Sequence, residues 1–333
     1  MKQHRYKHGP SHSRGLALVE LMIAMTLGLI LIGAATGIML SNSQSFRAAQ
    51  NLSKAQESAR LGFELMARDM RQAGSIPCGN GIPVENLLND SNPWYLNWAG
   101  QPKNSLGTSA NSASVARGQL IGYPAAFTVS GLDNKVTGTE SITILYASNE
   151  GASVKSRSIE DGKQTYKVKV SNRSHSFNTG DIAFLCNQDF ASIFAVHVTA
   201  DDDSLKITTL DGQKPSDAAQ GLFDRNATVG KLKSRAWYIG SNKDQKKSLY
   251  LAELTGSDLA LIEIATGVSN LSFQYRLKDT VDFKDAKDIA ANQWPLVNAV
   301  AVTLEFEDQN TMSDDERIKR SFTSIVALRN RSQ

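Results

Sequence analysis

The chain has 333 residues, of which 41% are hydrophobic and 21% charged, and its formal net charge is +3. This composition is typical of a globular protein and excludes a disordered or low-complexity chain. Four basic residues, Lys2, Arg5, Lys7 and Arg14, precede the first apolar run with no opposing acid, so the rest of the chain is nearly neutral. Because such a body has no general attraction for nucleic acid, we expect no direct nucleic-acid binding.

The first predicted element is an apolar helix over residues 16–40, in which Glu20 is the only charged residue. At about 1.5 Å per residue, this helix can cross the roughly 30 Å hydrocarbon core of a bilayer. Gly28, Gly33 and Gly37 would allow close approach of neighbouring helices. The basic flank precedes the helix and none follows it, which predicts a cytoplasmic N-terminus and an extracytoplasmic body.

Three interpretations of this segment compete. The basic start and small residues such as Ala34 fit a cleaved secretory signal peptide, and the length fits a permanent anchor. Neither explains Glu20, because a carboxylate in hydrocarbon is costly and needs a partner unless it is tolerated near the interface. The run "RGLALVE" resembles the type IV prepilin signal, which is cut by prepilin peptidase between Gly15 and Leu16. The new amine of a neighbouring subunit could then pair with Glu20.

An amphipathic helical segment is predicted over residues 41–73. It has no proline, Gly62 is its only glycine before the end, and its composition favours helix. Gly74 and Pro77 mark the end of the helix. We therefore expect one helix from Leu16 to Gln72, whose second half packs under a globular head through an apolar stripe made of Leu52, Ala55, Ala59, Phe63, Met66 and Met70.

The head is predicted to occupy residues 74–333 and to begin with a long loop. Trp94, Tyr95 and Trp98 interrupt this loop, where they either attach it to the body or form an exposed surface for a partner or glycan. Short segments rich in β-branched and aromatic residues follow from Ser141 without regular helical patterns, which predicts antiparallel sheet. They are residues 141–148, 165–171, 181–187, 191–199, 204–210, 233–240, 248–254, 259–265, 268–277, 298–308 and 321–330.

An acidic turn, Asp201 to Asp203, joins two of these predicted strands. The run lacks the spaced ligands and closing glutamate of an EF-hand, so we interpret it as a solvated hairpin tip and predict no metal site.

Two cysteines, Cys78 and Cys186, are the only ones in the chain. An oxidising extracytoplasmic compartment favours a disulfide between them, and two buried free thiols are the alternative. A lone pair without C-x-x-C spacing does not indicate a metal site or redox catalysis.

Catalytic motifs are not found in the sequence. It contains no G-x-S-x-G, P-loop, H-E-x-x-H or dinucleotide fingerprint, and His175 and His197 are the only histidines beyond the basic N-terminus. We therefore expect neither an enzyme nor a bound cofactor, and an anchored hydrolase is the weakest alternative.

Beyond its N-terminal signal, the chain resembles the PilW family of type IV pilus minor pilins. The resemblance is carried, in family order, by "MARDMRQAGSIPCG", "GTESITILYAS", "GDIAFLCNQDFASIFAVHVT", "RAWYIG", "SLYLAEL", "IATGVSNLSFQY" and "FTSIVALRNR". It implies an α+β, pilin-like fold in which one long helix packs on an antiparallel head of two sheets. It also implies that residues 1–15 are a leader peptide, that Leu16 is methylated after cleavage, and that Cys78 and Cys186 form the family's disulfide. Leu16 stands where major pilins most often have phenylalanine.

The resemblance also implies a role and a location. A minor pilin of this kind waits in the inner membrane with its head in the periplasm. With other minor pilins, the major pilin and the assembly platform, it primes pilus growth and ends at the pilus tip, supporting twitching, adhesion or DNA uptake. A J-type minor pseudopilin of type II secretion is the nearest alternative. A tip adhesin that binds through Trp94 and Trp98 is an alternative of another class.

Overall fold

The computed structural model describes residues 16–79, 82, 84–88, 93–96, 98, 120–160, 163–170, 177–201, 204–209, 223, 227–307 and 319–328. The chain forms two compact units, residues 1–56 and residues 57–333. The expected leader, residues 1–15, lies outside the described residues.

One helix, α1 (Leu16–Gln72), runs through the end of the first unit and into the second, as the sequence predicts. It ends where expected, because Gly74 adopts φ +76°, a left-handed conformation that glycine accepts at little cost. The Ala73 N–H donates to the Met70 carbonyl at 3.1 Å and closes the last turn. The long single helix is therefore confirmed.

Two sheets make up the head. The larger contains β1 (Val84–Asn86), β2 (Leu120–Tyr123), β3 (Ser141–Glu160), β4 (Lys163–Val170), β5 (Ile182–Cys186), β6 (Ala191–Asp201), β7 (Ser204–Thr209), β8 (Thr228–Ser241), β9 (Lys247–Thr255) and β10 (Asp258–Thr266). The smaller has the order β12 (Phe283–Asp285), β11 (Val268–Leu277), β13 (Val297–Glu307) and β14 (Lys319–Ala327). The described residues also form the 3-10 helices η1 (Trp94–Leu96), η2 (Ala286–Asp288) and η3 (Ala291–Leu296).

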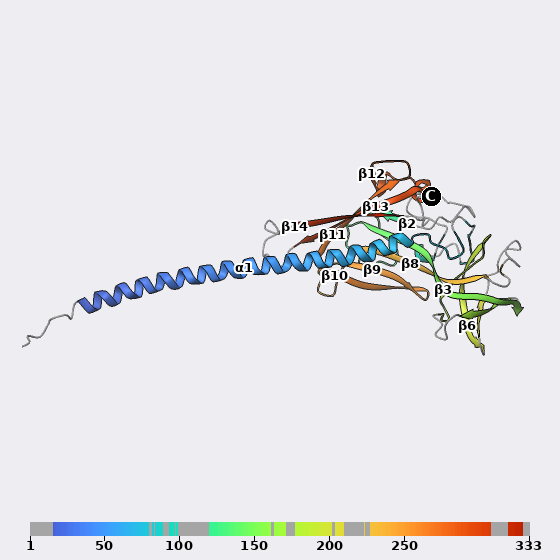
Figure 1. Ribbon diagram of the computed structural model, residues 1–333, viewed down its shortest axis with the longest axis horizontal. Helices are drawn as coiled ribbons and strands as arrows, with labels where there is room; N and C mark the ends of the chain where they lie inside the picture. The colour runs from blue at the N-terminus through green and yellow to red at the C-terminus, as the bar shows by residue number, and fades with distance from the viewer. Residues whose placement is uncertain are drawn as a thin grey trace, which may run out of the picture. The chain divides into compact units, whose positions relative to one another are not determined.

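The C-terminal part of α1 lies against both sheets (Figure 1). Met66 and Met70 of the predicted apolar stripe are fully buried. A Cβ added at Gly62 would lie 3.0 Å from Leu249 Cδ2 of β9 and 3.4 Å from Leu304 Cδ1 of β13. The small residue at this position lets the helix approach both sheets closely.

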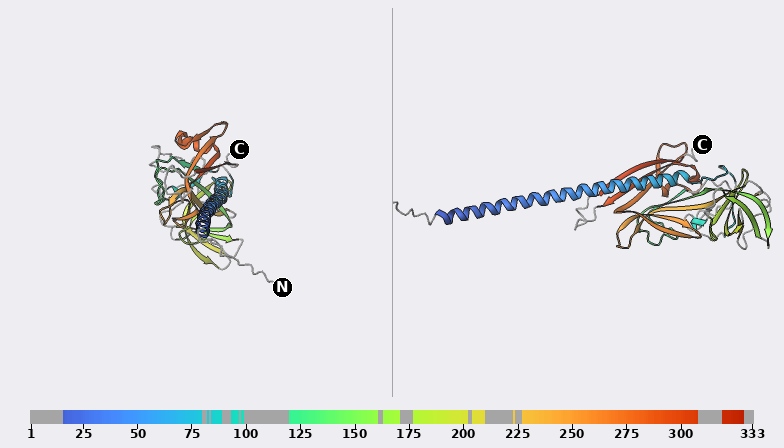
Figure 2. Two further views of the ribbon diagram at one scale, coloured as in Figure 1. Left: turned by 90° about the vertical axis from the view of Figure 1, so that its left-hand side faces the viewer. Right: turned by 60° about the horizontal axis from the view of Figure 1, so that its bottom comes forward.

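Part of the larger sheet closes on itself. The strands β8, β5, β6, β7, β4 and β3 pair in that order, and β3 pairs again with β8. Figure 2 shows the green and yellow strands of this barrel gathered at one end of the head. Its apolar interior comes from all six strands, for example Val154, Tyr166, Leu185, Phe194 and Ile207. Where these strands form a closed ring, closure removes the exposed edges that they would otherwise present.

The predicted antiparallel head of two sheets is confirmed, with additions. Each predicted strand has a counterpart, while β1, β2 and β12 were not anticipated. Among the described strand pairs, β1 with β6 is the parallel exception. The closing contact between β3 and β8 was not predicted either.

A methyl group at Gly230 is expected to destabilise the barrel. Gly230 lies in β8 between β3 and β5, and a Cβ there would lie 2.0 Å from the backbone oxygen of Ser148. Because backbone must move, Gly230→Ala should lower the free energy of unfolding by about 1–3 kcal/mol.

Thermal unfolding of the full-length protein in detergent, followed by circular dichroism, checks this prediction. Gly28→Ala is the matched control, because nothing described lies within 4 Å of the added methyl. An unchanged midpoint for Gly230→Ala would show that the barrel accommodates the methyl group.

Candidate functional site

The first part of α1 presents an apolar surface with no partner among the described residues. Its large apolar side chains between Leu18 and Leu40 are all more than half exposed. By length and composition, α1 can cross a membrane. The helix remains regular through Gly28, Gly33 and Gly37, where an added Cβ would meet nothing within 4 Å. Surface of this kind needs either lipid or other helices around it.

Glu20 is exposed on this apolar segment. The helix begins at Leu16, so the two residues are one turn apart on one face. The hydroxyls of Thr26 and Thr36 donate to helix carbonyls of Ile23 and Ile32, each at 2.9 Å. Among the described residues, by contrast, no hydrogen bond or ion pair is found for the Glu20 carboxylate. Gly15 lies outside the described residues.

The Sγ atoms of Cys78 and Cys186 form a disulfide in the structure, with 5.9 Å between the Cα atoms. The bond attaches the segment that follows α1 to the end of β5 and closes a sequence separation of 108 residues. In the loop-entropy description, a closure of this length stabilises a fold by roughly 4–5 kcal/mol.

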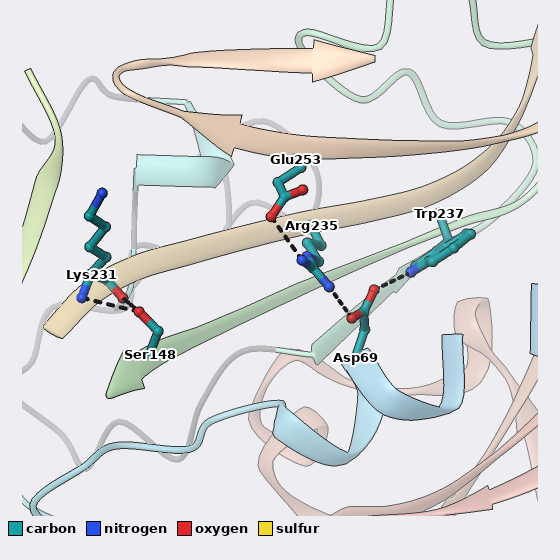
Figure 3. Close-up of polar contacts among 6 residues, drawn as sticks. All are labelled: Asp69, Ser148, Lys231, Arg235, Trp237 and Glu253. Atoms are coloured by element: carbon teal, nitrogen blue, oxygen red, sulfur yellow. Dashed lines mark hydrogen bonds and ion pairs between the residues drawn. The ribbon is translucent and has the colours of Figure 1, made fainter. Parts of the chain in front are cut away.

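A buried ionic cluster joins α1 to the larger sheet (Figure 3). Asp69 is only 1% exposed and accepts hydrogen bonds from Arg235 Nη1 of β8 and, at 2.9 Å, from Trp237 Nε1. Arg235 Nη2 donates to Glu253 Oε1 of β9 at 2.8 Å. The guanidinium also lies 5.9 Å from the ring centre of Tyr146. One arginine therefore connects the helix with three strands of the sheet.

Burial raises the pKa of the Asp69 carboxyl above its ordinary value, although the charge of Arg235 and the Trp237 hydrogen bond oppose the rise. The folded chain thus binds a proton at Asp69 more readily than the unfolded chain does. The contribution of this group to stability is greatest below the unfolded pKa and is lost as pH rises through the folded pKa.

A half-buried carboxylate links the two sheets. Glu140 precedes β3 and accepts a hydrogen bond from the backbone N–H of Phe273 in β11 at 2.8 Å. Burial raises the pKa of this carboxyl as well. Like Asp69, this carboxylate lies at a junction between layers of the head.

The aromatic residues of the long loop do not form an exposed surface. Trp94 is 4% exposed, and its Nε1 donates to the Ser130 carbonyl at 3.0 Å. Trp98 is fully buried, with its ring centre 5.2 Å from that of Phe184. The interpretation of these tryptophans as a partner or glycan surface is therefore wrong, because they attach the loop to the head.

The acidic hairpin is present as expected, since Asp201 of β6 pairs with Ser204 of β7. The side chains of Asp201 to Asp203 lie outside the described residues, as does His175. His197 is exposed, and its Nδ1 lies 3.4 Å from the Thr179 hydroxyl. Within the described residues, no group of three or more His, Cys, Asp or Glu side chains could hold a metal ion.

Sequence reasoning missed the Asp69 cluster. Two signals were available in the sequence. One is a carboxylate between Met66 and Met70 of the predicted apolar stripe, and the other is an arginine two positions before a tryptophan in a strand. Both patterns place a charge where burial is expected, and a buried charge requires a partner.

The comparisons with known proteins locate one match. A family model described as the prokaryotic N-terminal methylation motif matches residues 10–36. No curated protein and no solved structure matches the chain. The matched segment includes Gly15, Leu16 and Glu20 and covers the start of α1. The motif supports a pilin-like or pseudopilin-like protein and implies processing by prepilin peptidase.

Proposed function

We propose that this protein is a minor pilin that helps to initiate type IV pilus assembly. The observation that carries the proposal is the methylation motif over residues 10–36, followed by one helix that is apolar first and packs on a β-rich head afterwards. The helix supplies a stem for the membrane or filament, and the head supplies the specificity for partner subunits. This role is structural, without catalysis or a cofactor.

The mechanism begins with cleavage between Gly15 and Leu16 and methylation of the new amine of Leu16. In hydrocarbon the Glu20 carboxylate is costly without a partner, and the amine of a neighbouring subunit supplies one as stems bundle. The apolar side chains from Leu18 to Leu40 then exchange lipid for neighbouring helices. The head stays periplasmic while the complex forms, and it is carried to the pilus tip as major pilin adds below.

The order and extent of the PilW-like segments favour a priming complex of a pilus. Its members would be other minor pilins and the major pilin, on the inner-membrane assembly platform. A J-type pseudopilin of type II secretion would use the same stem chemistry, so it is the alternative. Burial of Trp94 and Trp98 removes the surface that favoured a tip adhesin.

Mass spectrometry of the N-terminal peptide from native membranes tests the proposal. The expected chain starts at N-methylated Leu16. A chain that starts at Met1 or near Gly37 would overturn the filament assignment. Finding the processed protein in sheared pili would support the pilus, whereas a secretion defect without a piliation defect after gene deletion would support the pseudopilin.

A further inference from the structure

Three basic side chains lie at alternate positions of β8 and therefore share one face of the strand. They are Lys231, Lys233 and Arg235. Figure 3 shows the first and third of them on this strand. Lys231 Nζ lies 2.7 Å from Asp181 Oδ2, and Arg235 binds Asp69 and Glu253. Lys233 is half-buried, and no hydrogen bond or ion pair is found for its ammonium group in the described part of the chain.

The strand arrangement leaves a gap beside this lysine. One edge of β8 is paired with β3 along nearly its whole length. The opposite edge is shared, since β5 pairs with residues 228–231 and β9 with residues 235–241. No described strand pairs with that edge over residues 232–234.

A pocket of about 280 Å³ lies at this gap. Its walls are residues 231–233 of β8, the start of β5 with the turn before it, and the end of β9 with the turn after it. Asn178 and Thr255 add an amide and a hydroxyl to the wall. The volume is at the lower limit for ligand pockets and suits a group no larger than a small dicarboxylate.

We propose that this gap pocket binds a carboxylate group through Lys233. The carboxylates that line it, Asp181 and Glu253, already bind Lys231 and Arg235. The Lys233 ammonium is therefore the cation available to an incoming anion, and Asn178 and Thr255 can donate further hydrogen bonds. A charge-assisted bond to a partly buried ammonium is stronger than a neutral one. The carboxylate belongs either to a free small acid or to an acidic side chain of a partner subunit.

The free-acid source is tested with the full-length protein in detergent. Glutarate, added against sodium chloride at equal ionic strength, should raise the thermal midpoint of the wild type by roughly 2–5 °C at saturation. Lys233→Gln should abolish the rise and Lys233→Arg should retain it. Lys243→Gln, which makes the same charge change in an exposed turn, should leave the rise intact. Each variant is compared with and without glutarate, so any change in its own stability cancels.

The partner source is tested by cross-linking in native membranes with a water-soluble carbodiimide. The reagent activates a carboxyl group, the Lys233 amine displaces the resulting urea, and an amide forms. The water that is formally lost is taken up by the carbodiimide. Only an amine and a carboxyl in contact are joined, and mass spectrometry identifies the linked peptides.

A link from Lys233 to an aspartate or glutamate of another chain assigns the pocket to a partner subunit, whatever glutarate does. Glutarate stabilisation that depends on Lys233, without such a link, assigns it to a free acid. Two results together would overturn the proposal. Glutarate would have no effect that depends on Lys233, and Lys233 would be either not cross-linked or cross-linked only to Asp181 or Glu253 of its own chain.

Discussion

Replacing Arg235 by methionine is expected to lower the free energy of unfolding by about 3–5 kcal/mol, because it leaves a carboxylate buried without its cation. Asp69 is 1% exposed, and among the described residues Trp237 Nε1 would be the hydrogen-bond donor that it retains. Methionine fills much of the volume of the arginine stem, so the loss reports charge more than packing. Denaturant unfolding of the full-length protein in detergent, followed by tryptophan fluorescence, measures it.

The free energy of unfolding that Arg235→Met loses should depend on pH. Burial already raises the pKa of Asp69, and removal of Arg235 takes away the charge that opposes the rise. Below the unfolded pKa, about 3.9 for aspartate, both states are protonated and the missing cation matters least. As pH rises through the interval between the unfolded and folded pKa values, the unfolded state ionises first. The difference in free energy of unfolding between the variant and the wild type should therefore grow from pH 4 towards pH 7.

A double variant separates charge from packing. Asp69→Leu combined with Arg235→Met removes both members of the pair and should be markedly more stable than Arg235→Met alone. Glu253→Gln should cost less than Arg235→Met, because the Glu253 side chain is 22% exposed and can be hydrated. A deficit that does not change with pH would contradict the assignment of Asp69 as the stranded charge.

The helix and most strands could be predicted because their signals are local. The apolar spacing around Met66 and Met70 and the left-handed Gly74 specify where α1 packs and where it ends. Alternation along each strand indicates extended backbone in the same way whether the sheet is open or closed.

The barrel could not be predicted from these patterns. Its closure depends on the second pairing of β3 with β8, for example Ala152 with Val229, and alternation does not specify which strands pair. The strands β1 and β12 have three residues each and are too short to show a period.

The candidate site also divides into residues whose relationship is local in the sequence and residues that only folding brings together. Gly15, Leu16 and Glu20 lie within one short motif, so their relationship is visible in the sequence. Asp69 and Arg235 are 166 positions apart, and only folding brings them together. Trp98 shows a further limit, because an aromatic residue in a polar loop has the same sequence context whether it is buried or exposed.

Glu20→Gln is expected to lower the amount of this protein in filaments at least about tenfold while leaving cleavage and membrane insertion intact. The change keeps the shape of the side chain and removes the charge that would attract a neighbouring amine. Each 1.4 kcal/mol of lost pairing free energy corresponds to a factor of ten, and a buried pair deprived of one partner loses more than that. Immunoblots of sheared filaments and of membranes from the same cells provide the ratio.

Glu64→Gln is the matched control, because it makes the same chemical change on the same helix but outside the apolar segment. Glu64 forms a surface ion pair with Arg60 at 3.0 Å, and such pairs contribute little. If both variants enter filaments as well as wild type, Glu20 is an acid tolerated near the membrane interface. The stem would then assemble through apolar contact alone, and its selectivity would have to reside in the head. If only Glu20→Gln is excluded, the carboxylate specifies how neighbouring stems align, because apolar side chains pack against one another in many registers whereas a charge pair fixes one.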